Sequence, residues 1–459
     1  MKLTIVHPCI GRIPGKEYVR SWQMEPLPAA HLAGLTPDDV EIAFWDDRME
    51  DIPYDEPTDL VAISVETYTA RRAYEIASEF RRRGVPVVMG GFHATLMPHE
   101  VQQYAESVVV GEAEAVWQQV IDDARNHRLQ PRYRAQGRPD IACVRPDRSI
   151  FEGKRYLSIG LIEAGRGCNF RCEFCAVQTV FGATQTRRSV ETIVEEIREL
   201  RGRRKLFFFV DDNMVAHPES AKRLFRALIP LKIKWVSQAT VTMAEDEEML
   251  ELMKASGCQG VLIGFESLHE SNLALMNKSF NTARMGPREA VRRLHAKGIR
   301  LYATFVFGYD HDTLEDFERT RRFCEDEGIF MVAFNHLTPF PGTPLYARLE
   351  REGRLLYDKW WLDERYRYGQ VPFRTTLDAG LISERCVEMR KKFYGPWSIL
   401  RRARNRANIS NWTMFHSYFF INALLRKEAA QRENYPLGDL SYSGPLLQVE
   451  EGASVAVSA

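Results

Sequence analysis

The chain has 459 residues, of which 45% are hydrophobic, 27% charged and 11% aromatic. This balance is typical of a folded globular protein and excludes a disordered chain, a collagen-like repeat and a small disulfide-stabilised scaffold. The 62 Lys and Arg residues equal the 62 Asp and Glu residues in number, so the chain has no net basic charge with which to attract nucleic acid.

We expect no targeting or membrane-spanning segment. No stretch reaches the ~20 consecutive apolar residues that a helix needs to cross a bilayer, and residues 1–16 do not follow the pattern of a secretory signal. Eight cysteines, three of them close together, indicate reduced thiols rather than disulfides. The sequence therefore predicts a multidomain protein located in the cytoplasm.

Residues 1–130 are predicted to form a doubly wound α/β domain of the Rossmann or flavodoxin-like kind. Apolar runs predict strands at 2–6, 40–45, 60–65, 85–89 and 107–110. Residues 67–83 carry apolar side chains at helical spacing and end at Gly84, which is typical of a helix and its C-terminus. Strands separated by crossovers imply a parallel sheet, and such sheets bind ligands at the carboxyl ends of their strands.

Residues 131–156 are polar and rich in Pro and Arg, and we expect a linker there, with a short hairpin at most. A more regular alternation of strands and helices fills residues 157–346. Its strands are predicted at 158–163, 205–210, 234–241, 260–265, 300–307 and 330–337, and its helices at 190–201, 218–228, 246–256, 284–297 and 313–327. Six such units predict a partial (β/α)6 barrel of the TIM type, with functional residues at the carboxyl ends of its strands.

The C-terminal third differs in character. Residues 347–445 are expected to form a helical cap, and residues 446–459 a disordered tail. Residues 387–430 mix aromatic residues with arginines, which leaves two interpretations open. They could form an amphipathic segment that meets a lipid-like substrate near an anionic membrane. The favoured interpretation is a cap that closes the open side of the barrel and keeps its arginines in solvent.

The strongest functional signal is a group of three cysteines. Cys168, Cys172 and Cys175 follow a Cys-x3-Cys-x2-Cys spacing directly after the first predicted strand of the barrel. Thiolates are the usual ligands of iron–sulfur clusters, and three of them on a four-iron cluster leave one iron open to a substrate or cofactor. Structural zinc needs four ligands, and no fourth Cys or His lies nearby in the sequence.

The block EAGRGCNFRCEFCAVQ resembles the radical S-adenosylmethionine (SAM) superfamily, as do FFFVDDN, GVLIGFES and TPFPGTPLY further along the chain. The resemblance implies a 4Fe–4S cluster on the three cysteines, with SAM bound to the open iron and cleaved to a 5′-deoxyadenosyl radical. It also implies that Phe174 lies near the adenine, and that an electron donor such as flavodoxin or ferredoxin reduces the cluster.

Four further residues are candidates for SAM contacts. Asp211 and Asp212 end a predicted strand, where a carboxylate could accept hydrogen bonds from the methionine ammonium group; the alternative is that they cap the next helix. Glu266 could contact the ribose or the amine, or it could pair with an arginine of the barrel. Gln238 lies on the third strand of the barrel.

Residues 60–120 resemble the cobalamin-binding domain of B12-type radical SAM enzymes. Gly90, Gly91 and Gly111 follow predicted strands and allow a ligand to approach the backbone closely. Ser64 and Thr67, at the end of the preceding strand, are candidates for binding the nucleotide tail. Ordinary loop chemistry is the alternative for each of these positions.

The Asp-x-His-x-x-Gly motif with which many B12 proteins provide a histidine to cobalt is absent. We therefore expect cobalamin to bind without a histidine as its lower ligand. His93 and His99 are expected to be surface or loop residues without carboxylate partners.

The resemblance predicts a cobalamin-dependent radical SAM methyltransferase that methylates an unactivated carbon of a small-molecule or lipid-like substrate. Two alternatives stay open: cyclisation, carbon–carbon coupling or oxidation without methyl transfer, and a non-catalytic cluster or cobalamin sensor. We expect no nucleic-acid partner, and we keep peripheral membrane contact through the C-terminal helices as a hypothesis. The sequence identifies neither the substrate nor a catalytic side chain.

Overall fold

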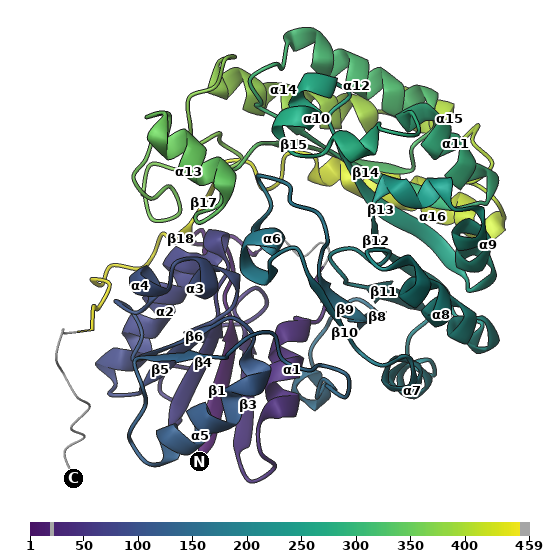
Figure 1. Cartoon of the computed structure of the whole chain (residues 1–459). Helices are drawn as coiled ribbons and strands as arrows, with labels where there is room; N and C mark the ends of the chain where they lie inside the picture. The colour runs from purple at the N-terminus through teal and green to yellow at the C-terminus, as the bar shows by residue number, and fades with distance from the viewer. Residues whose placement is uncertain (19–22, 450–459) are drawn as a thin grey trace.

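A computed structural model describes residues 1–18 and 23–449 of the chain. Within these residues, two six-stranded sheets form the framework, and helices cover them (Figure 1). The first sheet belongs to the N-terminal part of the chain and the second to the barrel, so the predicted α/β fold class is confirmed.

The N-terminal sheet has the predicted doubly wound architecture. Its strands are β1 (Lys2–His7), β3 (Glu41–Asp46), β4 (Leu60–Ser64), β5 (Val87–Gly90), β6 (Ser107–Val110) and β7 (Arg132–Arg134). They lie in the order β3-β1-β4-β5-β6-β7, and all neighbours are parallel. The associated helices are α1 (Leu27–Leu35), α2 (Ala70–Arg82), α3 (Phe92–Leu96), α4 (Pro98–Val101), α5 (Trp117–Arg125), η1 (Thr67–Thr69) and η2 (Ala113–Ala115).

Buried apolar runs form the centre of this sheet. The side chains of β6 are buried throughout, as are all but the last of β4. Helices cover both faces of a parallel sheet, so neither face needs polar residues. The strand β7 corrects the expectation of a linker with a hairpin at most, because it pairs with β6 in parallel. Its sequence, Arg-Tyr-Arg, buries only Tyr133 and lacks an apolar run.

The second sheet confirms the six-unit barrel. Its strands are β8 (Ile159–Ile162), β11 (Leu206–Phe209), β12 (Trp235–Ala239), β13 (Cys258–Glu266), β14 (Arg300–Phe307) and β15 (Met331–His336). They lie in the order β15-β14-β13-β12-β11-β8, all neighbours are parallel, and no pairing within the described residues joins β15 to β8. The outer helices are α7 (Val190–Leu200), α8 (Pro218–Leu228), α9 (Glu247–Ala255), α11 (Pro287–Ala296) and α12 (Leu314–Asp326).

Helices of the C-terminal region lie beside the last strand of the barrel. They are α14 (Ala379–Phe393), α15 (Pro396–Arg402) and α16 (Trp412–Glu428), whereas α13 (Pro344–Arg351) contacts the loop after β8. The Tyr394 hydroxyl, just after α14, donates to the carbonyl of Val332 on β15 at 2.8 Å. The fully buried Arg402 guanidinium of α15 donates to the carbonyls of Ile329 and Phe330. These bonds hold α14 and α15 against β15. The buried Arg402 departs from the expectation that the arginines of this region are in solvent.

The last described residues return to the N-terminal sheet. The short strand β18 (Gly438–Asp439) pairs with β2 (Gly11–Arg12). The Leu447 amide then donates to Ser78 Oγ on α2 at 2.8 Å, and the Val449 amide donates to a carbonyl after α4. Residues 446–449 are therefore held in place, contrary to the expected disordered tail. Residues 450–459 of that tail lie outside the described residues.

Candidate functional site

The three cysteines lie on one loop after β8. The loop begins with β9 (Gly165–Gly167), which pairs with β10 (Gln185–Arg187), and it ends at α6 (Ala176–Phe181), where Cys175 is the N-cap residue. All three cysteines are free and half-buried. The loop therefore presents three thiols at the carboxyl end of a barrel strand, where the sequence placed them.

Asp211 and Asp212 hold the start of this cysteine loop. Asp211 Oδ2 accepts a hydrogen bond from the Ala164 amide at 2.9 Å, and Asp212 Oδ2 accepts one from the Gly167 amide at 2.7 Å. The N-cap of α8 is His217, so the alternative that these aspartates cap the helix is wrong. Burial raises the pKa of Asp211 to about 7, and its Oδ1 is buried without a partner among the described residues.

Three contacts fix the rest of the loop. The rings of Phe170 and Phe280 stack with their centroids 3.8 Å apart. The Glu173 amide donates to the Met276 carbonyl at 3.1 Å, and the Glu173 carboxylate accepts a hydrogen bond from Arg348 of α13 at 2.8 Å. The loop is thus held from several elements of the barrel, which favours a fixed arrangement of its thiols.

Hydrogen-bond donors are directed at the sulfur atoms. Asn213 Nδ2 lies 3.6 Å from Cys168 Sγ. Burial raises the pKa of Cys175, while the amides of Val177 and Gln178 at the start of α6 donate toward its sulfur and oppose that rise. Donors to sulfur stabilise thiolates that carry the negative charge of a cluster site. The sequence argument quoted Asn213 within a motif and gave it no role.

Glu266 forms a buried ion pair with a lysine, whereas the sequence offered a barrel arginine as its possible partner. It ends β13 at a φ of 64°, and its Oε1 accepts a hydrogen bond from Lys278 Nζ at 2.7 Å. Lys278 also donates to the Gly264 carbonyl and lies over the ring of Phe174, 6.0 Å from its centroid. Burial raises the pKa of Cys172 to about 12, and the Lys278 ammonium group opposes that rise. Phe174, Glu266 and Cys172 therefore surround one cation.

Gln238 lies apart from this ion pair, on β12. Its side chain is half-buried, and its carbonyl accepts a hydrogen bond from the Met214 amide at 3.0 Å. That bond ties β12 to the segment after β11, which also carries Asp211 and Asp212. The described residues show no hydrogen bond from the Gln238 side chain.

The residues fit a multi-iron cluster better than a single ion. No three His, Cys, Asp or Glu side chains in the described part of the chain converge closely enough to hold one metal ion. A four-iron cluster binds each thiolate through a different iron, so its ligands need not converge on one point. Three free thiols on one fixed loop, with donors to sulfur, match that requirement.

Ser64, Gly90 and Gly91 meet at the carboxyl ends of β4 and β5, where Ser64 pairs with Gly90 in the sheet. Gly91 has a φ of +97°, and a Cβ there would stand 2.9 Å from the Val65 carbonyl oxygen. Gly111 has a φ of +87° and open space around it. The turn therefore requires glycine at Gly91, whereas Gly111 leaves the backbone accessible to a ligand.

Thr67 contacts a buried histidine within the same domain. Thr67 Oγ1 and His93 Nδ1 are 3.2 Å apart, and His93 Nε2 lies 3.1 Å from Glu100 Oε1. The expectation that His93 is a surface residue without a carboxylate partner is therefore wrong; His99 is exposed, as expected. The turn at Pro98 brings Glu100 back to His93, and spacing along the sequence does not reveal that turn.

The strand ends of the N-terminal sheet lie against the cysteine loop. Phe92, which follows Gly91, meets Phe181 of α6 with ring centroids 5.5 Å apart. Arg166, two residues before Cys168, pairs with Glu114 at 2.5 Å. Figure 1 shows α3 and α6 side by side at this interface. The two predicted cofactor sites therefore face each other.

The turn after β4 is fixed locally and is tied to the barrel. Glu66 and Thr69 form a capping box at the start of η1, and the Glu66 amide donates to Thr69 Oγ1 at 3.0 Å. Tyr68 lies with its hydroxyl 3.1 Å from Thr338 Oγ1, in the segment after β15. This contact connects the carboxyl end of β4 to the barrel.

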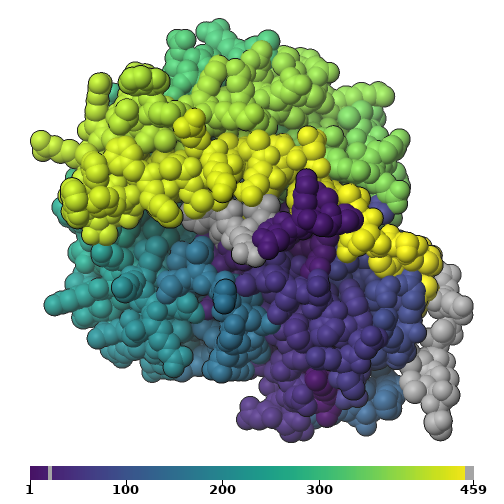
Figure 2. Space-filling view, turned by 180° about the vertical axis from the view of Figure 1, so that it is seen from behind, coloured from purple at the N-terminus to yellow at the C-terminus, as the bar shows by residue number. Residues whose placement is uncertain are grey.

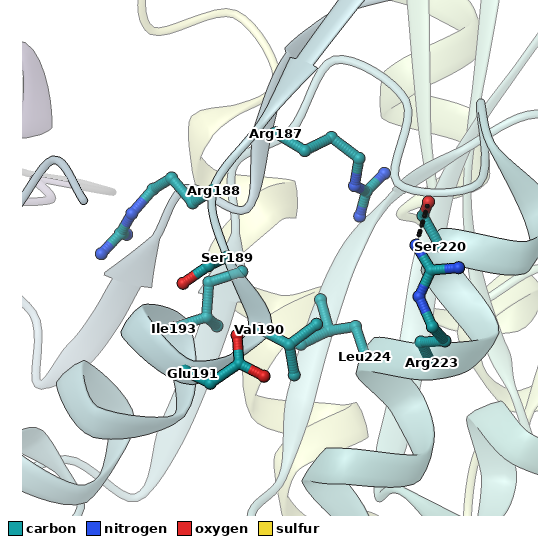
Figure 3. A pocket seen from close by; sticks show the side chains of 9 residues that line it. All are labelled: Arg187, Arg188, Ser189, Val190, Glu191, Ile193, Ser220, Arg223 and Leu224. Carbon is teal, nitrogen blue, oxygen red and sulfur yellow. Dashed lines mark hydrogen bonds between the residues drawn. The ribbon is translucent and has the colours of Figure 1, made fainter. Parts of the chain in front are cut away.

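A separate pocket of about 450 Å³ opens between α7 and α8 (Figure 3). Arg187 and Arg223 extend on the same side of it, whereas Arg188 points away from them. Arg223 donates to Ser220 Oγ at 3.0 Å. No cysteine and no predicted site residue lines this pocket, so it is distinct from the cysteine loop.

Comparisons with known proteins agree with this geometry. The Radical SAM superfamily model matches residues 162–324. Bacteriochlorophyllide d C-12(1)-methyltransferase of Chlorobaculum tepidum is 31% identical over 414 residues, which cover 88% of this chain and 89% of the relative. The same bacterium's bacteriochlorophyllide d C-8(2)-methyltransferase is 30% identical over 352 residues, with 72% and 77% covered. The fold is similar to that of the methyltransferase TsrM from Kitasatospora setae, whose structure has cobalamin and a 4Fe–4S cluster bound. The TM-score is 0.65 and the sequence identity 15%, over 94% of this chain and 100% of that one.

Proposed function

The chain belongs to the radical SAM superfamily, to the group of its cobalamin-type methyltransferases, and on this premise we propose that it methylates an unactivated carbon of a small organic substrate with the help of cobalamin. It is an enzyme of a family that uses SAM and a 4Fe–4S cluster. One observation carries the proposal. The strand ends with Gly91 and Gly111 lie directly against the cysteine loop, so two cofactors bound at these edges would share one substrate space.

Cys168, Cys172 and Cys175 would hold the cluster, and Phe174 and Glu266 lie where SAM would bind beside it. When bound, the cluster supplies the electron that cleaves SAM, and cobalamin supplies the methyl group that is transferred. The chain's own residues position these groups. Asp211 and Asp212 hold the loop by its backbone amides, as described above. The free Oδ1 of Asp211 is the atom we assign to the SAM ammonium group.

We assign cobalamin to the edge formed by Ser64, Gly90, Gly91 and Gly111, within a domain of residues 1–130. Thr67 acts on this site indirectly, because its hydroxyl contacts His93. Both ring nitrogens of His93 have partners inside the fold, which supports cobalamin without a histidine as its lower ligand. Residues 157–346 form the radical SAM barrel in this proposal, and residues 347–445 form its cap.

We propose flat, largely apolar molecules such as chlorin-type tetrapyrroles as the first substrate class to test. Both similar relatives are named for bacteriochlorophyllide d. Aromatic rings also gather at the contact between the sheets, where the ring of Tyr68 lies 5.0 Å from that of Tyr368 and 5.8 Å from that of Phe340. Half-buried rings of this kind offer stacking surfaces for a planar substrate.

The test begins with anaerobic reconstitution. The protein is loaded with iron, sulfide and cobalamin, desalted, and examined by ultraviolet–visible spectroscopy for cluster and corrin bands. The Cys168→Ala, Cys172→Ala and Cys175→Ala variants should lose the cluster band. Cys143→Ala is the matched control, because Cys143 is free and exposed outside the loop.

Activity is then measured with SAM, a low-potential reductant and bacteriochlorophyllide. S-adenosylhomocysteine, 5′-deoxyadenosine and a product heavier by one methyl substitution would support the proposal. Retention of a cluster without corrin, with 5′-deoxyadenosine but no S-adenosylhomocysteine, would overturn methyl transfer and favour cyclisation, coupling or oxidation. A cluster that never cleaves SAM would favour a sensor.

A further inference from the structure

The outer face of α15 and α16 exposes large apolar side chains. Trp397 is 85% exposed, Trp412 76% and Phe420 70%, and Leu400 and Phe415 are also exposed. These five residues are named the aromatic patch. Outside it, no Trp or Phe among the described residues is exposed. Exposed apolar side chains gathered on neighbouring helices mark an interaction site rather than ordinary surface.

The aromatic patch is not the result of loose packing, because the inner faces of both helices are fully engaged. The Tyr418 hydroxyl of α16 donates to the Ile399 carbonyl of α15 at 2.7 Å. Arg402 of α15 donates to Asn422 Oδ1 of α16 at 3.0 Å. Tyr418 and Asn422 are buried, so Phe420, two residues from each of them, projects from the opposite side of the same helix.

The exposed rings on α16 are also ordered among themselves. The ring of Trp412 lies 4.4 Å from that of His416 and 5.8 Å from that of Phe415. Figure 2, seen from behind, shows the C-terminal segment as a continuous band across this face of the molecule. The described part of the chain places no covering element over the patch, since these side chains remain accessible.

The region around the aromatic patch is positively charged. Residues 389–427 contain nine Lys and Arg residues and no Asp or Glu. Arg390 and Arg401 pair with carboxylates of other segments, and Lys392 pairs with Glu388 of its own helix. Five others are exposed and have no carboxylate partner in the described part of the chain. Lys391 lies on α14, whereas four lie on α16 or between α15 and α16: Arg404, Arg406, Arg426 and Lys427. An apolar patch bordered by unpaired cations complements a surface that is both apolar and anionic.

We propose that the aromatic patch binds the surface of an anionic phospholipid bilayer, with its rings at the headgroup level and the four cations on lipid phosphates. Trp and Phe beside Lys and Arg are typical of interfacial helices. No helix of the described residues is long and apolar enough to cross a membrane, so the contact is peripheral. A second copy of the chain fits less well, because a symmetric contact would set this basic face against itself. The inference does not depend on the proposed function.

The experiment measures co-sedimentation of the full-length protein with vesicles of phosphatidylcholine, with or without phosphatidylglycerol. The wild type should bind the anionic vesicles and dissociate as salt is raised. Changing Trp397, Trp412 and Phe420 to Ser should weaken binding at least ~10-fold, because three apolar anchors are lost. Changing the four cations to Gln should weaken it by a similar factor and remove the salt dependence.

The control is a Leu314→Ser, Leu356→Ser variant, which removes exposed apolar side chains elsewhere and should bind like the wild type. All variants must keep the thermal midpoint of the wild type, which separates lost binding from lost folding. Equal vesicle binding by the wild type and the aromatic variant would overturn the proposal, as would no binding by either. A wild-type dimer in light scattering that the aromatic variant abolishes, without vesicle binding, would assign the patch to self-association instead.

Discussion

Replacing Lys278 with Met removes the cation that faces Glu266 and Cys172. At the observed 2.7 Å, the attraction between Lys278 and Glu266 amounts to roughly 6 kcal/mol with an effective dielectric constant of about 20. Both side chains are only 9% exposed, so Glu266 would remain buried without a counter-charge. Removal of one partner of a buried pair costs about 3–5 kcal/mol. We expect the Lys278→Met variant to lose that much free energy of unfolding.

Urea unfolding of the cluster-free protein, followed by circular dichroism under reducing conditions, measures this loss. The double variant Glu266→Gln, Lys278→Met separates charge from packing. Gln keeps the shape of Glu at the positive φ of position 266, and no buried charge remains, so we expect stability within about 1–2 kcal/mol of the wild type. The reasoning is refuted if the single variant unfolds at the wild-type midpoint, or if the double variant is no more stable than the single one.

Three further predictions concern the other buried groups. Gly91→Ala should lower the free energy of unfolding by about 2–4 kcal/mol, because of its φ of +97° and the nearby Val65 carbonyl. Gly153→Ala, which has open space around it, should lower it by only about 1–2 kcal/mol. Equal urea midpoints of the two variants would contradict this. Because burial raises the pKa of Asp211 to about 7, its stability contribution is present below its unfolded pKa and lost as the pH rises toward 7. As the pH rises from about 4 to 7, Asp211→Asn should therefore gain free energy of unfolding relative to the wild type, by up to about 4 kcal/mol, and parallel pH curves of the thermal midpoint would argue against it. Burial alone would raise the pKa of Glu100, but its hydrogen bonds from His93 and Trp361 hold it at about 2. The stabilisation that ionised Glu100 provides is present above its unfolded pKa and lost as the pH falls toward 2. Glu100→Gln should therefore lower the free energy of unfolding by about 3 kcal/mol at pH 7 and by little at pH 2. A loss of equal size at both pH values would contradict this.

The fold was predictable because its signal is local. The six strands of the barrel are apolar runs separated by amphipathic helices, most of which end near a glycine, and each strand was predicted within a few residues of its observed bounds. The strand β7 was missed because only its middle residue is buried. Residues 446–449 were missed because hydrogen bonds of their backbone amides hold them in place. Side-chain composition does not reveal such bonds.

The candidate site was predictable only where its residues are close in sequence. Cys168, Cys172 and Cys175 share one loop, so their spacing was informative. Lys278 reaches Glu266 across a turn and the short helix α10 (Glu270–Leu275), which contain no recognisable motif, and its role appears only when the chain is folded. Asp211 and Asp212 were correctly placed at a strand end, but backbone amides of the cysteine loop occupy an oxygen of each.

Ion pairs and an aromatic contact join the facing edges of the two sheets. Glu112 and Glu114, after β6, both pair with Arg166 of the cysteine loop. Their carboxylates are only 7% exposed, so these pairs are largely shielded from water and their geometry fixes one edge relative to the other. Phe92 and Phe181 pack against each other at the same edge. The glycines that follow β5 and β6 lie at this edge too, and because these contacts set it directly against the cysteine loop, we place both proposed cofactors there.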